Sequence, residues 1–182
     1  MRIVITGATG NVGTALIDAL VSDDRDDEII GLARRMPQWT PPRTELRSVD
    51  IARDDLTPHL AGAHAVVHLA WLFQPTHQPL VTWDVNVIGS QRVFEAAARA
   101  GLATLIHASS VGSYSARVDD HPVDESWPTH SLPTAAYGRE KAYGGEAANL
   151  VADILSGAHP LVNFSGTRFE DSCPLDADES NR

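Results

Sequence analysis

The chain has 182 residues, 43% of them hydrophobic and 21% charged, a composition that suits one globular domain with a proper core. Its formal net charge of -10 disfavours binding to nucleic acid or to an anionic membrane, because both need a basic face. No apolar stretch approaches the roughly 20 residues that span a bilayer, and no signal peptide is recognisable. With Cys173 as the single cysteine, the sequence predicts a protein of the reducing cytoplasm.

Apolar runs of strand length alternate along the chain with segments of helical spacing. In chain order we expect strands at 3–5, 28–32, 45–51, 65–69 and 104–108, with 159–164 as a candidate sixth strand. Helical spacing covers 12–21, 81–100 and 134–155, and Gly101 is placed to end the second of these helices. Such alternation predicts an α/β fold, a doubly wound parallel sheet with helices on both faces.

Three glycines, Gly7, Gly10 and Gly13, follow the first strand at intervals of three residues. In a strand-turn-helix context, the first glycine permits a tight turn and the second lets the backbone approach a pyrophosphate. The third glycine allows the helix to pack closely on the strand. Free N–H groups and the positive end of the helix dipole then attract phosphate charge. The spacing therefore predicts a dinucleotide site.

The end of the second strand bears on the choice of dinucleotide. An acidic residue about 20 positions past the last glycine accepts hydrogen bonds from a ribose 2′-hydroxyl and indicates NAD. This chain has Ala33 there, followed by Arg34 and Arg35. Guanidinium groups can bind a 2′-phosphate, so the sequence favours NADP and leaves NAD open; solvated surface arginines are the alternative interpretation.

The run Tyr137-Gly138-Arg139-Glu140-Lys141 resembles the catalytic motif of the short-chain dehydrogenase/reductase superfamily. The glycine spacing is similar to that of its extended branch, the NAD-dependent epimerases and dehydratases. Four further segments are similar to that branch: 49–51, 67–71, 86–90 and 108–114. Together the matching segments cover residues 1 to about 145, and the resemblance implies a Rossmann-type NAD(P)-binding domain.

The resemblance also implies a set of residues that contact the cofactor. It comprises Gly7, Thr9, Gly10, Asn11, Val12 and Gly13 in the glycine turn, Arg34, Asp50 and Ile51 after the second and third strands, Leu69 and Ala70 after the fourth, and Asn86, Tyr137 and Lys141 near the active centre.

Ser110, Tyr137 and Lys141 form the catalytic set that the resemblance implies. On a helix, Tyr137 and Lys141 share one face, four residues apart. A nearby ammonium favours the phenolate form of a tyrosine, which makes Tyr137 a candidate general acid/base. In the resembling enzymes the lysine also contacts the nicotinamide ribose, and the serine hydrogen-bonds the substrate oxygen.

The eight histidines suggest no metal site. His64 and His68 have the four-residue spacing of helical ligands, but they flank a predicted strand, where four residues span roughly 13 Å. His107, inside an apolar run, is interpreted as a hydrogen-bonded core residue. We therefore expect no bound metal.

The resemblance stops after about residue 145, where extended family members continue into a domain that binds substrate. The sequence predicts a cofactor domain over 1–165 and a disordered acidic tail over 166–182. We therefore expect the substrate-binding C-terminal domain of the family to be largely missing from the 182 residues. Three explanations stay open: a fragment of a longer enzyme, a changed reading frame near residue 145, or a small cofactor-binding protein.

Two functions follow as expectations. The first is an NAD(P)-dependent epimerase, dehydratase or reductase acting on a nucleotide sugar, ketone or aldehyde, with Tyr137 as general acid/base beside the nicotinamide. The second is a noncatalytic dinucleotide-binding module or inactive fragment. Members of the resembling family often form homodimers through the helices corresponding to 81–100 and 134–155, although the sequence itself shows no interface.

Overall fold

The computed structural model describes residues 1–73, 77–102, 104–124, 126–154 and 161–164. These residues form a parallel sheet of six strands in the spatial order β3-β2-β1-β4-β5-β6. The strands are β1 (Arg2–Thr6), β2 (Glu28–Ala33), β3 (Thr44–Ser48), β4 (Ala65–His68), β5 (Thr104–Ala108) and β6 (Leu161–Phe164). The strand order reverses between β1 and β4, as in doubly wound dinucleotide-binding sheets, and this confirms the predicted fold class.

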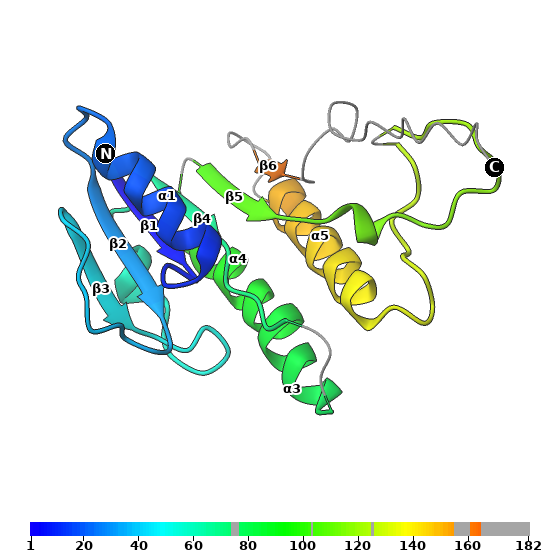
Figure 1. Ribbon diagram of the computed structural model, residues 1–182, viewed down its shortest axis with the longest axis horizontal. Helices are drawn as coiled ribbons and strands as arrows, with labels where there is room; N and C mark the ends of the chain where they lie inside the picture. Colours follow the sequence, from blue (N-terminus) through cyan, green and yellow to red (C-terminus); the bar gives the residue numbers. More distant parts are fainter. Residues whose placement is uncertain (74–76, 103, 125, 155–160, 165–182) are drawn as a thin grey trace, which may run out of the picture.

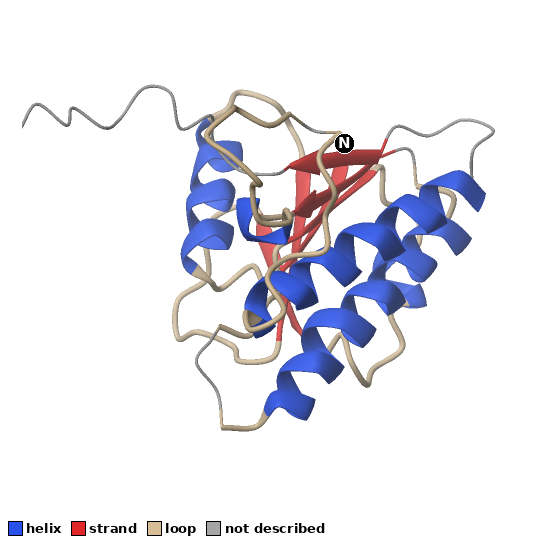
Figure 2. Ribbon diagram, turned by 90° about the vertical axis from the view of Figure 1, so that its right-hand side faces the viewer, coloured by secondary structure: helices blue, strands red, loops and turns tan. Residues whose placement is uncertain are grey.

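Helices cover both faces of this sheet (Figures 1 and 2). The α-helices are α1 (Asn11–Ser22), α2 (Thr57–Leu60), α3 (Pro79–Trp83), α4 (Gly89–Arg99) and α5 (Ala136–Ile154). A π-helical segment, η1 (Asp84–Ile88), joins α3 to α4, and a short 3-10 turn, η2 (Val111–Ser113), follows β5. Helix α1 lies on one face, while α4 and α5 lie on the other.

The side-chain alternation of β1 explains the two layers. Ile3 and Ile5 pack with Ile17 of α1 in one apolar cluster. Val4, between them in sequence, points to the opposite face and packs in a second cluster with Phe94 of α4. All four isoleucine and valine side chains are at least 94% buried. A strand that is apolar on both faces needs helices on both sides, as the sequence predicts.

Two predicted elements differ from the structure. The strand expected at 45–51 ends at Ser48, because Asp50 turns the chain: its carboxylate accepts the Ala52 N–H at 3.0 Å, and its carbonyl accepts the Arg53 N–H. The single helix expected over 81–100 is interrupted by η1. Of the candidate sixth strand, 161–164 is present, while 159 and 160 lie outside the described residues, as does the expected tail 166–182. Within the described part of the chain, no helix is both long and apolar enough to cross a membrane.

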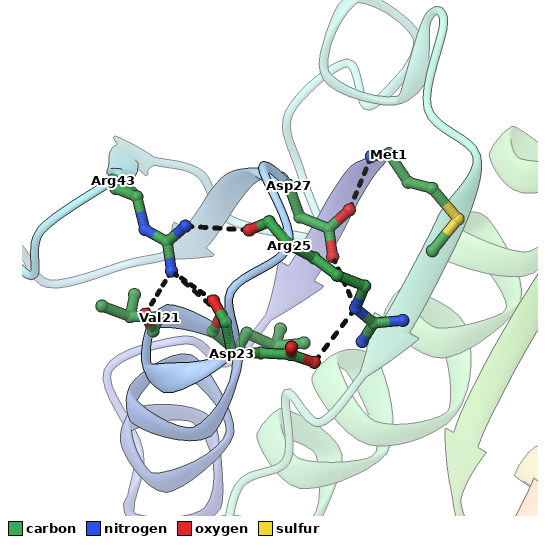
Figure 3. Close-up of polar contacts among 7 residues, drawn as sticks. Met1, Val21, Asp23, Arg25, Asp27 and Arg43 are labelled. Atoms are coloured by element: carbon green, nitrogen blue, oxygen red, sulfur yellow. Dashed lines mark hydrogen bonds and ion pairs between the residues drawn. The ribbon is translucent and has the colours of Figure 1, made fainter.

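Polar contacts tie the loop between α1 and β2 to the start of β1 and to the segment before β3 (Figure 3). The Met1 ammonium donates to Asp27 Oδ1 at 2.6 Å, and Arg25 Nε lies 3.6 Å from Asp27 Oδ2. Arg43, which has a positive φ of 52°, donates to main-chain carbonyls of this loop, those of Leu20, Val21, Asp23 and Arg25. These contacts lie at the amino ends of β1, β2 and β3, at the opposite end of the sheet from the carboxyl ends of the strands.

Asp27→Asn is expected to lower stability at pH 7 and to have little effect in acid. The hydrogen bond from the Met1 ammonium lowers the pKa of the Asp27 carboxyl, so its stabilisation is present above the ordinary carboxyl range and is lost as the pH falls through the lowered value. Urea unfolding at pH 7 and near pH 3 measures both effects, with Asp26→Asn, an exposed neighbour, as control. A loss of equal size at both pH values would contradict this account.

Candidate active site

A pocket of about 200 Å³ lies at the carboxyl ends of β1, β2 and β4, where the strand order reverses. In open α/β sheets this is the usual place for a ligand. The lining residues come from the glycine turn and from the segments that follow β2, β3 and β4: Gly7, Thr9, Gly10, Leu32, Ala33, Arg34, Arg35, Val49, Ile51, Leu69, Ala70, Trp71, Leu72 and Val85. We call it the glycine-turn pocket.

The glycine turn has the geometry that the sequence predicts. Gly7 has a φ of +73°, and a Cβ there would lie 2.7 Å from the Ala70 main-chain nitrogen. A Cβ on Gly13 would lie 2.4 Å from the Gly7 carbonyl oxygen, so α1 packs directly on the turn. Gly10 is exposed and meets only the Gly7 carbonyl, at 3.3 Å. The turn is therefore closed toward the sheet and open toward the pocket, a cradle that suits a phosphate group.

Of the predicted cofactor residues, seven line the pocket: Gly7, Thr9, Gly10, Arg34, Ile51, Leu69 and Ala70. Four do not. Asn11 and Val12 are exposed in the first turn of α1, and Gly13 is buried beneath the glycine turn. Asp50 forms the turn after β3, with its carboxylate bonded to the Ala52 N–H.

The predicted catalytic residues converge between β5 and α5. Ser110 follows the end of β5, and its Oγ accepts the Gly112 N–H at 3.1 Å. A Cβ on Gly112 would lie 3.4 Å from Ser110 Oγ and 3.7 Å from the Tyr137 ring, so these side chains are neighbours. One helical turn later, Lys141 Nζ donates to the Ala108 carbonyl at 2.7 Å. The structure thus brings Ser110, Tyr137 and Lys141 together.

Trp71, which the sequence did not single out as a site residue, connects this group with the glycine-turn pocket. Its indole lines the pocket, and Lys141 Nζ lies 3.5 Å from the ring centroid, a cation–π contact. The Tyr137 ring meets the indole edge-on, with 5.9 Å between centroids. Burial lowers the pKa of Lys141 to about 8. The lysine remains mostly protonated at pH 7, although it is only 4% exposed.

Asn86 is fully buried in η1 and does not line the pocket. Its side chain accepts the Leu72 N–H at 2.7 Å and donates to the Leu72 carbonyl at 3.0 Å. It also donates to the buried carboxylate of Glu140, which the sequence interpretation passed over although it directly precedes Lys141. Asn86 therefore acts on the pocket through Leu72.

The three histidines that the sequence singles out are core residues or lie near the surface. His64 Nδ1 accepts the Arg2 N–H at 3.0 Å, whereas the buried rings of His68 and His107 stack with 5.4 Å between centroids. Burial lowers the pKa of both rings, that of His107 to about 3, so both are neutral. The hydrogen bond expected for His107 is not found within the described residues. Those residues also include no cluster of three or more potential metal ligands.

Residues 3–153 match the model of the NAD dependent epimerase/dehydratase family. The match includes the glycine turn, the segment containing Asn86, and all three residues of the predicted catalytic set. The chain belongs to this family. The predicted resemblance is thereby confirmed at the level of the family.

Two curated relatives illustrate the range of the family. The chain is 30% identical over 165 residues to UDP-glucose 4-epimerase of Mycolicibacterium smegmatis, covering 85% of this chain and 52% of the relative. It is 32% identical over 171 residues to L-arabinose 1-dehydrogenase (NAD(P)(+)) of Haloferax volcanii, covering 84% of this chain and 61% of the relative.

A solved structure is also similar in sequence and fold. A short-chain dehydrogenase/reductase superfamily protein from Agrobacterium tumefaciens, crystallised with bound NAD, has a TM-score of 0.76 and 30% identity. The similarity covers 90% of this chain and 48% of that protein. The chain thus spans about half the length of the family members that it matches.

Proposed function

We propose that the chain binds a nicotinamide dinucleotide in the glycine-turn pocket and is an epimerase, dehydratase or reductase of the extended short-chain dehydrogenase/reductase type. One observation carries the proposal: Trp71 lines the pocket and also contacts both Lys141 and Tyr137. A dinucleotide whose phosphates lie at the glycine turn would therefore extend past Trp71 toward Lys141 and Tyr137 of the predicted catalytic set. The glycine turn supports the fit, since a Cβ on Gly7 or Gly13 would clash with main-chain atoms beneath the turn, while Gly10 leaves its open side without a side chain.

Each catalytic side chain has a chemical task in this proposal. Tyr137 exchanges a proton with a substrate hydroxyl or carbonyl, and the Lys141 ammonium contacts the nicotinamide ribose. Ser110 Oγ accepts the Gly112 N–H, and its own proton can be donated to the substrate oxygen. When bound, the cofactor supplies or accepts a hydride at the same substrate carbon.

The substrate class that the relatives favour is a nucleotide sugar, since one of them is named UDP-glucose 4-epimerase. Incubation of the chain with UDP-glucose and NAD, followed by chromatography, tests this activity through the appearance of UDP-galactose.

The second candidate is a noncatalytic dinucleotide-binding module, favoured by the half-length coverage of the relatives. It predicts cofactor binding without turnover of any nucleotide sugar, ketone or aldehyde. Pairing of two copies through the segments 81–100 and 134–155 stays a prediction.

Arg34→Ala is expected to weaken NADPH binding roughly tenfold or more and NADH binding much less, because loss of a charged hydrogen bond costs about 1.5–3 kcal/mol. The exposed Arg34 lines the pocket beside Ala33, where a 2′-phosphate would lie in the predicted NADP mode. Fluorescence titration with each cofactor gives both dissociation constants, and Arg99→Ala, on the exposed side of α4, is the control. The solved relative carries NAD, so the preference for NADP rests on this arginine alone. An equal loss of affinity for NADPH and NADH in Arg34→Ala would contradict the preference for NADP.

Cofactor affinity is expected to fall as the pH rises above 8. The buried Lys141 has a pKa of about 8, and the proposed contact with the ribose needs its ammonium form. Binding must then take up a proton above that pH, which weakens affinity by up to about tenfold per pH unit. NADH titrations at pH 7, 8 and 9 measure the slope. Lys141→Met should bind weakly with no such slope, and a slope that persists in this variant would refute the assignment.

A further inference from the structure

A buried chain of hydrogen bonds begins at the last residue before the glycine turn. Thr6 Oγ1 accepts the Ala70 N–H at 3.3 Å and lies 2.6 Å from His68 Nδ1. His68 Nε2 lies 2.8 Å from Ser90 Oγ, and Ser90 donates to the Asn86 carbonyl at 2.6 Å. Thr6, His68, Ser90 and Asn86 are each at most 1% exposed.

The direction of every bond in this chain is determined. The buried His68 ring is neutral, so one of its nitrogens carries a proton and the other accepts. Ser90 donates its only hydroxyl proton to the Asn86 carbonyl, so Ser90 Oγ must accept the hydrogen bond from His68 Nε2–H. Nδ1 is then the acceptor for the Thr6 hydroxyl. The bonds fix η1 against β1 and β4.

The series of hydrogen bonds continues from the Asn86 side chain to Glu140 on α5. Asn86 Nδ2 donates to Glu140 Oε2 at 2.7 Å, and Thr82 Oγ1 donates to Glu140 Oε1 at 2.9 Å. Glu140 is 3% exposed, and burial of a carboxylate is costly unless it accepts such bonds. Because Asn86 also bonds both main-chain polar groups of Leu72, Glu140 joins four segments: α5, α3, η1 and the pocket wall at Leu72.

The position of Glu140 makes this junction relevant to the catalytic set. It lies directly before Lys141 and three residues after Tyr137, on the helix that carries both. Leu72 directly follows Trp71, on whose ring the Lys141 ammonium lies. A shift of α5 relative to η1 would therefore move Lys141 and Tyr137 relative to the pocket wall.

We propose that Glu140 is a positioning residue, which acts through Asn86 and Leu72 to set the distance between the catalytic helix and the glycine-turn pocket. The inference rests on the proposed function. It predicts that Glu140 affects the nicotinamide half of the cofactor, next to Lys141 and Tyr137, and not the adenosine half, which the glycine turn and Arg34 would contact.

The test compares Glu140→Ala and Glu140→Gln in the 182-residue chain, with Glu146→Ala, an exposed carboxylate on α5, as control. A glutamine can still accept from Asn86 through its oxygen and donate to Thr82, whose proton then goes to the Pro79 carbonyl, 3.0 Å away. Dissociation constants for NADH and for ADP are measured together with thermal unfolding. Glu140→Ala should bind NADH roughly tenfold more weakly, since a buried polar partner is lost. ADP binding should stay within about twofold of the unmodified chain, and Glu140→Gln should restore NADH binding.

Three results would overturn the inference: unchanged NADH binding in Glu140→Ala, parallel losses of NADH and ADP, or equal losses in the glutamine and alanine variants. If Glu140→Ala does not fold, Thr82→Val provides the test, because it removes the hydrogen bond of 2.9 Å from Thr82 to the Glu140 carboxylate. It should weaken NADH binding by roughly threefold and leave ADP unchanged, and unaltered NADH binding would refute the role. Failure of the unmodified chain to bind NADH would instead refute the proposed function itself.

Discussion

Gly7→Ala is expected to lower the free energy of unfolding by at least about 2 kcal/mol and to remove measurable cofactor binding. Gly7 has a φ of +73°, in the left-handed region that residues with a Cβ avoid. The added carbon would lie 2.7 Å from the Ala70 nitrogen and 2.8 Å from the Leu69 carbonyl carbon, both main-chain atoms of the pocket wall. Neither can move without disturbing the end of β4. Urea unfolding and NADH titration measure the two losses.

Gly10→Ala is the matched control within the same turn. Gly10 has a φ of -82°, which alanine adopts readily, and its Cβ would meet only the Gly7 carbonyl, at 3.3 Å. Stability should change by less than about 1 kcal/mol, while NADH binding should weaken because the methyl group stands on the open side of the turn. Wild-type NADH affinity in both variants would show that the turn does not contact the cofactor.

Tyr137→Phe is expected to lower turnover by about 10²- to 10⁴-fold, the usual contribution of a general acid/base, in any reaction that the unmodified chain catalyses. The ring would keep its edge-on contact with Trp71, whose indole lies 5.9 Å away between centroids. Only the hydroxyl is lost, so NADH binding should stay within about twofold. Initial rates and a parallel NADH titration separate the two effects.

Tyr143→Phe provides the control for this substitution. Tyr143 lies on α5 as well, but it is 51% exposed and packs against Trp83, with 5.0 Å between ring centroids. Removal of its hydroxyl should leave both turnover and cofactor binding unchanged. Turnover that survives in Tyr137→Phe would exclude this tyrosine as the proton donor and acceptor.

The fold could be predicted because its determinants are local. Val4 and its isoleucine neighbours specify a strand buried on both faces, and the strand needs no distant partner to be recognised. Gly7 and Gly13 could be interpreted in the same way, since a tight turn and a close helix-strand contact each require a missing Cβ at one position. The same applies to Tyr137 and Lys141, whose spacing on a helix places them on one face.

The parts that were missed depend on contacts between distant residues. The π-helical segment η1 surrounds Asn86, whose side chain bonds to Leu72, 14 residues earlier, and to Glu140, 54 residues later. Apolar periodicity carries no information on such bonds, so a single helix was predicted there. Trp71 and Lys141 are likewise far apart in sequence, and their cation–π contact arises only when β4 and α5 are brought together. β3 ends early because Asp50 forms a turn with its own neighbours. The apolar residues Val49 and Ile51 on either side of Asp50 favoured a longer strand.

The most direct test of the account is a titration of the purified 182-residue chain with NADH and NADPH, followed by cofactor fluorescence and thermal stability. Saturable binding of at least one cofactor is predicted, together with a higher unfolding temperature at saturation, because a ligand that binds only the folded state stabilises it. Weaker binding in Gly10→Ala, which should keep its stability, would assign it to the glycine-turn pocket. Absence of saturable binding with both cofactors would contradict the proposal that this chain forms a working dinucleotide site.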